Sequence, residues 1–407
     1  MLTRIEALGF RCLRHVNQAL GPFQVLVGPN SSGKSTLLDV VSFVRQVLAD
    51  GPEAAVEQRV SRFEELVWGR AGEHFELAVE ARIPEALRSS VEVTRYQTAR
   101  FELRLEWDAE AGRAGIAEER LMLRNPAPAP AQQALELGDV PAVPETVFAP
   151  RQRGLTRTVV RKKRDTHDNY YSEITPEPGQ GWFAAARLGP WRSALANLPD
   201  DARAFPVASW LRTLLAEQVS ELNLRELAAR GPCPPLRGRR LRPDGSNLPW
   251  VVADLAARFP ERANGWVERV RAALPDLEAV RTAERQDDRH AYLVVRYQGG
   301  LEQPSWASSP GTLRVLALTL LEHLPGPPGI HLVELPESAL YPHAARVVFE
   351  SLRSVGSGQV LATTHSPELL ALAAPAEVLR FARDPSRGTL VTGGDPPCAP
   401  PCESAEA

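Results

Sequence analysis

The chain has 407 residues, 43% of them hydrophobic, and a formal net charge of −3 at pH 7. This length predicts two or three folding units, and no apolar stretch approaches the roughly 20 residues that a membrane-spanning helix needs. The start of the chain lacks a signal-like apolar core, so a cytoplasmic location is expected. Four cysteines cannot form a disulfide framework in a chain of this length.

The first predicted elements are a strand, a loop and a helix around a glycine-rich motif. Residues 28–35, GPNSSGKS, fit the pattern G-x-x-x-x-G-K-[ST]. The apolar run 23–27 before the motif favours a strand, and the apolar residues after it share one helical face. Those residues are Leu37, Leu38, Val41, Val44 and Leu48. A loop of this kind surrounds phosphates with backbone N–H groups, so the motif predicts nucleotide binding.

Lysine is rare in this chain: of 47 basic residues, only Lys34, Lys162 and Lys163 are lysines. A lysine kept in the glycine-rich motif is therefore informative, and its compact ammonium group suits the β- and γ-phosphates of a nucleotide. The hydroxyl of Ser35, the next residue of the motif, is expected to bind Mg²⁺.

The middle of the chain begins with strands. Residues 73–123 alternate between apolar and polar side chains, which predicts antiparallel strands attached to the first lobe. Residues 126–175 are expected to be a Pro/Ala-rich and basic linker.

Two basic clusters lie in the middle region. Arg151–Arg164 contains seven basic and no acidic residues, and a second cluster covers Arg237–Arg242. Such clusters suit the phosphate backbone of DNA. A solvated face that binds nothing is the alternative.

Residues 176–285 are predicted to form a compact helical insertion. Apolar residues recur there at three- and four-residue spacing, in Trp191–Leu227 and Leu248–Leu274. No long heptad run occurs, which excludes an extended coiled coil.

Three motifs follow between residues 286 and 390. A turn with Ser309 and Gly311 opens an apolar helix, which Ser309 should cap. One strand ends at Glu334, and another ends at Thr364 and His365 before a new helix begins.

The C-terminal residues 391–407 are rich in proline and are expected to be a disordered tail. Cys398 and Cys402 form a close pair in it, so a metal clip is an alternative.

Together these motifs resemble the ABC-type ATPases of the SMC/RecF/OLD group, and most closely the small bacterial AAA family ATPases with an ABC-type head. The resemblance covers IEALGFRCLRHVNQALGPFQVLVGPNSSGKSTLLDVV near the start, FEELVWG, LRPDGSNLPWVVADL and the three C-terminal motifs. It implies an α/β P-loop fold with a mixed sheet, an antiparallel β subdomain and a helical insertion. Residues 1–125 and 286–390 would be the two halves of the ATPase head.

The resemblance also implies roles for single residues. Glu334 would close the Walker B strand and share Mg²⁺ with Ser35, and His365 would be the switch histidine that senses the γ-phosphate. The residues expected to contact ATP in the same subunit are Arg11, Gly28, Asn30, Ser31, Ser32, Gly33, Lys34, Ser35 and Thr36.

Ser309 and Gly311 would form the signature turn, which in such proteins touches ATP bound to the other subunit. Because one chain then cannot make a complete site, a head-to-tail homodimer around two ATP molecules is implied.

One departure from the family pattern concerns catalysis. Relatives usually read EEPE followed by LHP, whereas this chain reads ELPE followed by LYP, so that Leu335 replaces the second acid. That acid activates water in such enzymes, and a general base is typically worth ~10² to 10⁴ in rate. Glu337 and His365 are the candidates to take over part of its role. Hydrolysis is therefore expected to be slow.

Two functions fit this sequence. The first is an ATPase whose dimer opens and closes in DNA repair or in defence against foreign DNA. The second is an ATP-dependent binding switch with negligible hydrolysis, which signals to a separate effector. Too few residues follow His365 for a Toprim nuclease domain, so any nuclease would be another chain. A transporter subunit fits less well, because SSPGTLR departs from the usual transporter signature.

Overall fold

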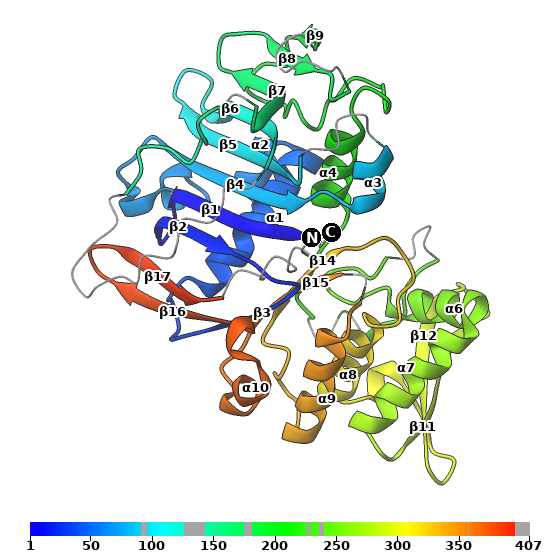
Figure 1. Cartoon of the computed structure of the whole chain (residues 1–407). Helices are drawn as coiled ribbons and strands as arrows, with labels where there is room; N and C mark the ends of the chain where they lie inside the picture. The colour runs from blue at the N-terminus through cyan, green and yellow to red at the C-terminus, as the bar shows by residue number, and fades with distance from the viewer. Residues whose placement is uncertain are drawn as a thin grey trace, which may run out of the picture.

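The computed structural model describes residues 1–90, 96–125, 143–152, 154–174, 181–224, 228, 230–235, 240–356 and 358–394. This part of the chain contains two large β-sheets and one small one, with helices packed between and outside them (Figure 1). None of the helices in these ranges has the length and hydrophobicity needed to span a bilayer.

The larger sheet is antiparallel, with the strand order β2-β1-β4-β5-β6-β7-β8-β9. Its strands are β1 (Leu2–Phe10), β2 (Leu13–Ala19), β4 (His74–Arg82), β5 (Thr98–Asp108), β6 (Arg113–Arg124), β7 (Thr156–Lys163), β8 (Asp168–Tyr171) and β9 (Trp182–Ala186). The predicted antiparallel subdomain is thus confirmed by β4, β5 and β6. One face of these strands is apolar, and the other buries Glu76, Glu80 and Glu102.

The structure differs from the expected linker over residues 126–175. Its second half forms β7 and β8, because Val159 and Val160 are buried in the core and two of the basic side chains of β7 are buried with partners. Lys162 Nζ lies 2.8 Å from Asp168 Oδ1, and Arg157 donates to the backbone oxygen of Glu173 at 2.9 Å. The first half of the expected linker lies largely outside the described residues.

The second sheet has the strand order β10-β14-β15-β3-β16-β17 and is parallel except for β17. Its strands are β3 (Phe23–Val27), β10 (Val219–Leu222), β14 (Ile330–Glu334), β15 (Gln359–Thr363), β16 (Val378–Asp384) and β17 (Gly388–Gly393). Side chains of β3 alternate between the faces: Leu26 joins one hydrophobic core, whereas Val25 and Val27 join the other.

The first core lies between the two large sheets and includes α1 (Lys34–Asp50) and α4 (Pro206–Glu217). The second core covers the opposite face of the six-stranded sheet. Its helices are α6 (Leu248–Arg258), α7 (Pro260–Ala273), α8 (Pro310–Leu320) and α9 (Pro342–Arg353), which group together in Figure 1. The shorter helices are α2 (Pro52–Glu57), α3 (Glu85–Ser90) and α10 (Pro367–Leu372).

The segment expected as a helical insertion, residues 176–285, contains α4, α6 and α7 but also strands. Besides β9 and β10 these include β11 (Leu277–Glu284), which forms a small antiparallel sheet with β12 (Ala291–Tyr297) and β13 (Glu302–Pro304). The apolar spacing of residues 219–222 had indicated a helix, but this segment forms β10, because it pairs in parallel with β14 at the edge of the sheet.

The first residues of the expected disordered tail are part of a strand. Residues 391–393 belong to β17 and pair with β16. Cys398 and Cys402 lie outside the described residues.

Candidate nucleotide-binding site

The phosphate loop joins β3 to α1 over residues 28–33 and depends on two glycines. Gly28 has φ +151°, and a Cβ there would lie 2.3 Å from the backbone oxygen of Phe381 in β16. Gly33 has φ +104°, and a Cβ there would lie 2.3 Å from Thr389 Oγ1 in β17. Both positions need glycine because neighbouring strands approach the loop closely.

The start of α1 has free capacity for an anion. Its N-cap, Gly33, supplies no side-chain hydrogen bond, and the first N–H groups of a helix lack intrahelical partners. Ser32 Oγ is buried without a hydrogen-bond partner among the described residues. These groups fit a phosphate chain.

Lys34 points back over this loop. Its Nζ donates to the backbone oxygens of Gly28 and Pro29, each at 2.8 Å. Burial lowers the pKa of Lys34, and the nearby carboxylate of Glu334 opposes that shift. An ammonium group held by neutral carbonyls beside one carboxylate can exchange those contacts for phosphate oxygens.

Glu334 is the last residue of β14, and it lies in register with Thr363 of β15. It lines the same cavity as Ser35. A carboxylate and a hydroxyl are oxygen ligands of the kind that Mg²⁺ prefers. The described residues contain no group of three or more His, Cys, Asp or Glu that could hold a metal alone. The donor set therefore fits Mg²⁺ bound together with nucleotide phosphates and water.

Leu335 follows Glu334 in a left-handed conformation with φ 47°. Its N–H lies 3.2 Å from both the backbone oxygen and Oγ1 of Thr363, and Arg314 donates to its carbonyl at 3.0 Å. These bonds fix a backbone conformation that costs roughly 1 to 3 kcal/mol for a non-glycine residue. The side chain lines the cavity but cannot accept a proton.

His365 and Glu337, the two candidates to accept a proton from the attacking water, differ in position. His365 is exposed and lines the cavity. Glu337 is not among the lining residues, and its Oε1 accepts from the His365 N–H at 2.9 Å and from Thr364 Oγ1 at 2.8 Å. Glu337 therefore anchors the loop that carries the histidine.

The cavity that these residues share has a volume of about 950 Å³ and is electropositive. Five lining residues are cationic and two are acidic, and the carboxylate of Asp39, which pairs with Arg59 and Arg11, offsets one of the three excess positive charges. The cationic residues are Arg11, Lys34, Arg59, Arg70 and Arg383, and the acidic ones are Glu65 and Glu334. Such a field favours a polyphosphate.

The cavity brings together most of the predicted contact residues. These are Arg11, Asn30, Ser31, Gly33, Lys34, Ser35, Thr36, Glu334 and His365. Gly28 and Ser32 belong to the same loop but are not among the lining residues. Ser309 and Gly311 do not line the cavity. As predicted, Ser309 caps α8, accepting from the Thr312 N–H at 3.0 Å.

Several lining residues were not predicted from the sequence. Arg59 pairs with Asp39 at 2.7 Å, and Arg11 approaches the same carboxylate at 3.3 Å. Trp68 and Arg70 belong to the stretch that begins FEELVWG, which was recognised only as part of the resemblance. No sequence signal marked Arg383.

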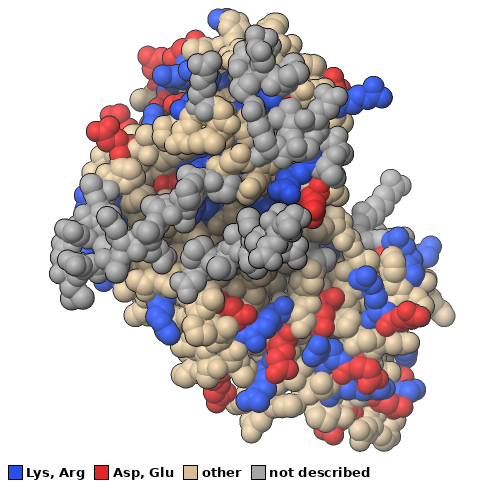
Figure 2. Space-filling model, in the orientation of Figure 1, with Lys and Arg blue, Asp and Glu red and all other residues tan. Residues whose placement is uncertain are grey.

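The first predicted DNA-binding cluster, residues 151–164, has fewer exposed basic side chains than the sequence indicated. Arg157 and Lys162 are buried, whereas Arg151, Arg161 and Lys163 are exposed. Arg164 is paired with Glu106 and Asp108. Residue 153 and residues 236–239 lie outside the described ranges. On the face shown in Figure 2, basic and acidic side chains are interspersed.

Residues 23–371 match the family model described as "AAA domain, putative AbiEii toxin, Type IV TA system". The chain belongs to this AAA domain family. It is therefore a P-loop ATPase by family, and the resemblance to AAA and ABC-type ATPases is confirmed.

Solved structures with this fold include SMC heads. The chain is similar to an SMC head bound to the C-winged helix domain of ScpA, with a TM-score of 0.56, 13% identity, and coverage of 96% of this chain and 97% of that one. It is also similar to an SMC head with an extended coiled coil bound to the C-terminal domain of ScpA derived from *Pyrococcus furiosus*, with a TM-score of 0.53, 12% identity and 96% coverage of both. The predicted fold class is confirmed.

One curated relative shares a short stretch. The OLD nuclease of *Thermus scotoductus* (strain ATCC 700910 / SA-01) is 43% identical over 44 residues, which is 11% of this chain and 8% of that protein.

Proposed function

We propose that this AAA family member binds Mg-ATP in the electropositive cavity and that two copies close head to tail around two nucleotides. Lys34 would contact the phosphates, while Ser35 and Glu334 would hold the metal, which neutralises charge that develops on the phosphates. His365, which lines the cavity, would sense the γ-phosphate. The observation that carries this proposal is the convergence of Lys34, Ser35 and Glu334 on one cavity.

Dimerisation is supported by the absence of the signature turn from the cavity of its own chain. Ser309 and Gly311, the signature turn, do not line the cavity of their own chain. Gly311 packs against the loop after β14, where a Cβ would lie 2.6 Å from the backbone oxygen of Ala339. A second copy could offer this turn to the nucleotide from across the cavity.

Slow hydrolysis follows from Leu335 in this proposal. A leucine cannot orient or deprotonate water, and a general base contributes typically ~10² to 10⁴ in rate. Phosphoryl transfer depends mainly on positioning and electrostatics, so residual turnover is expected from Lys34, the metal ligands and His365.

A role in DNA repair or in defence against foreign DNA is supported by the relatives. The family description names a putative toxin of a type IV TA system, and a short stretch is similar to an OLD nuclease. SMC heads, whose fold this chain shares, bind ScpA domains in solved structures. We infer that a separate effector or nuclease chain reads the ATP state of the dimer.

The second candidate is an ATP-dependent switch with negligible hydrolysis, which the apolar side chain of Leu335 favours. The slow ATPase and the switch can be distinguished by measuring both phosphate release and dimerisation at saturating Mg-ATP. Release clearly above that of a Lys34→Ala variant, together with ATP-driven dimers, supports the slow ATPase. Dimers with release at the variant's level support the switch. Failure of ATP to bind or to drive dimerisation would contradict both.

A further inference from the structure

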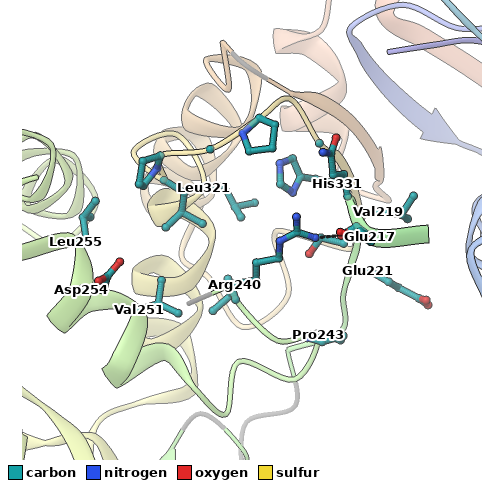
Figure 3. Close-up of a pocket in the computed structure, with 18 of the residues that line it drawn as sticks. Glu217, Val219, Glu221, Arg240, Pro243, Val251, Asp254, Leu255, Leu321 and His331 are labelled. Atoms are coloured by element: carbon teal, nitrogen blue, oxygen red, sulfur yellow. Dashed lines mark hydrogen bonds between the residues drawn. The ribbon is translucent and has the colours of Figure 1, made fainter. Parts of the chain in front are cut away.

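A second cavity, about 390 Å³ in volume, lies at the β10 edge of the six-stranded sheet. It shares no lining residue with the nucleotide cavity. Its walls come from β10, β14, α6, α1 and the residues that follow α8 (Figure 3). Its size is in the range of small-molecule sites and too small for a partner helix.

Most of the wall is apolar. Val251 and Leu255 of α6 face Leu321, which follows α8, and a proline-containing turn at residues 324–329. Further apolar residues of the wall include Val219, Leu241, Pro243, Leu324 and Pro325. Such a wall favours a ligand with a compact apolar body.

Two polar groups converge inside the cavity. The guanidinium of Arg240 points toward the imidazole of His331 (Figure 3). Arg240 also donates to the backbone oxygen of Glu217. His331 Nδ1 is buried, and the described residues provide no hydrogen-bond partner for it. A buried polar atom of this kind usually has a partner, so a ligand atom there would supply one.

The charged groups of the wall balance in number, with Arg45, Arg240 and Arg258 against Glu217, Glu221 and Asp254. Arg45 and Arg240 both line the cavity, and neither forms an ion pair with a described carboxylate. Asp254 pairs with Arg258 at 3.3 Å, and Glu221 accepts from Ser42 Oγ at 2.6 Å.

The histidine adds no charge of its own. Burial lowers the pKa of His331 to about 4, so the ring is neutral at ordinary pH. The guanidinium of Arg240 lies beside His331, whose Nδ1 has no partner among the described residues, and it forms no ion pair with a described carboxylate, so it favours an anionic group on the ligand at this end of the apolar wall.

We propose that this cavity is a binding site for a small organic anion with an apolar body, whose anionic group contacts Arg240 and whose polar atom meets His331. The site is independent of the proposed ATPase cycle. It nevertheless shares two elements with the nucleotide cavity, because α1 runs from Lys34 past Arg45 and β14 runs from His331 to Glu334.

The fluorescent probe anilinonaphthalene sulfonate has this chemistry, and the full chain saturated with Mg-ATP is the protein to titrate. We expect saturable binding of one probe per chain and displacement by octanoate, but not by inorganic phosphate or octanol. Arg240→Gln should weaken binding roughly tenfold or more, since charge-assisted hydrogen bonds are lost. His331→Leu should weaken it less, because the ring contributes one hydrogen bond.

Arg192→Gln is the matched control, because Arg192 is exposed and lines neither cavity. It should bind the probe as the wild type does. Thermal melts of each variant establish that it is folded. The proposal is overturned if binding does not saturate, if raising the ATP concentration displaces the probe, if octanol competes as well as octanoate, or if Arg240→Gln binds as tightly as the control.

Discussion

Glu337 and His365 are joined by a hydrogen bond: Oε1 of the carboxylate accepts the backbone N–H of the histidine at 2.9 Å. The same oxygen accepts from Thr364 Oγ1 at 2.8 Å. The histidine lines the nucleotide cavity, whereas the glutamate does not. Glu337 is thus a positioning residue for the loop of His365, rather than a group already placed to activate water.

Glu337→Ala should lower phosphate release without weakening Mg-ATP binding. The loop of His365 loses its anchor, and a small displacement of a catalytic group costs roughly tenfold or more in turnover. The measurement is a comparison of kcat with the Kd for Mg-ATP. Glu350→Ala, an exposed change on α9, is the control. An unchanged kcat in Glu337→Ala would show that the hydrogen bond has no role in turnover.

Mixing two inactive variants tests whether the site is completed by a second copy. Lys34→Ala removes the phosphate contact, and Ser309→Asp retains a good N-cap while placing a negative charge against the γ-phosphate. Each alone should release little phosphate. Random mixing should restore roughly a quarter of the wild-type rate, because half of the dimers then carry one intact site of two. No recovery on mixing, with both variants folded, would count against head-to-tail completion.

Glu173 makes stability depend on pH. Its carboxylate accepts the N–H groups of Val207 and Ala208 at the start of α4, at 2.7 and 2.8 Å, and burial raises its pKa to about 7. Between the ordinary glutamate pKa and about 7, the folded state keeps a proton that the unfolded state has lost. The free energy of unfolding should therefore fall as pH rises through this window, by at most ~1.4 kcal/mol per pH unit.

Urea unfolding of the wild type and of Glu173→Gln, between about pH 5 and about pH 7, measures this effect. The variant should be less stable at low pH, since glutamine cannot accept both N–H groups as well, but its stability should depend less on pH. Buried Glu119, whose pKa is also raised by burial, contributes in the same direction in both proteins. If the free energy of unfolding changed equally with pH in both proteins, Glu173 would be ruled out as a source of the pH dependence.

DNA binding, if it uses the first basic cluster, should depend on its exposed members only. Neutralising Arg161 and Lys163 together should weaken binding and reduce the salt slope by about 2, with an unchanged Tm. Lys162→Gln should instead destabilise the fold by roughly 3 to 5 kcal/mol, since it leaves buried Asp168 without its partner. Absence of binding by the wild type at low salt would contradict the DNA proposal.

Much of the candidate nucleotide site could be predicted because its parts are local in sequence. The glycines from Gly28 to Gly33 predict the backbone conformation of the phosphate loop. Glu334 could be predicted because it is the acidic residue at the end of an apolar strand. Ser309 could be predicted as an N-cap because it is a serine that directly precedes an apolar helix. Each of these three features is determined mainly by residues that are close in the sequence.

The remaining residues were not predictable because long-range pairing places them. Arg59 reaches the cavity through Asp39 and through its position over the ring of Phe43, 5.0 Å from the centroid. Lys162 looked like part of a basic surface, yet strand alternation turns it inward to Asp168. A sequence shows the charge of a side chain but not which face of a strand carries it.

The most direct test of the account is phosphate release by Leu335→Glu beside the wild type and Leu335→Gln. Glutamate restores a proton acceptor at the position that follows Glu334, whereas glutamine matches its size without that capacity. With saturating Mg-ATP, we expect Leu335→Glu to hydrolyse roughly tenfold faster or more than both others, with similar affinity for ATP. Equal rates in all three proteins, each binding ATP, would contradict the claim that the missing acid limits hydrolysis.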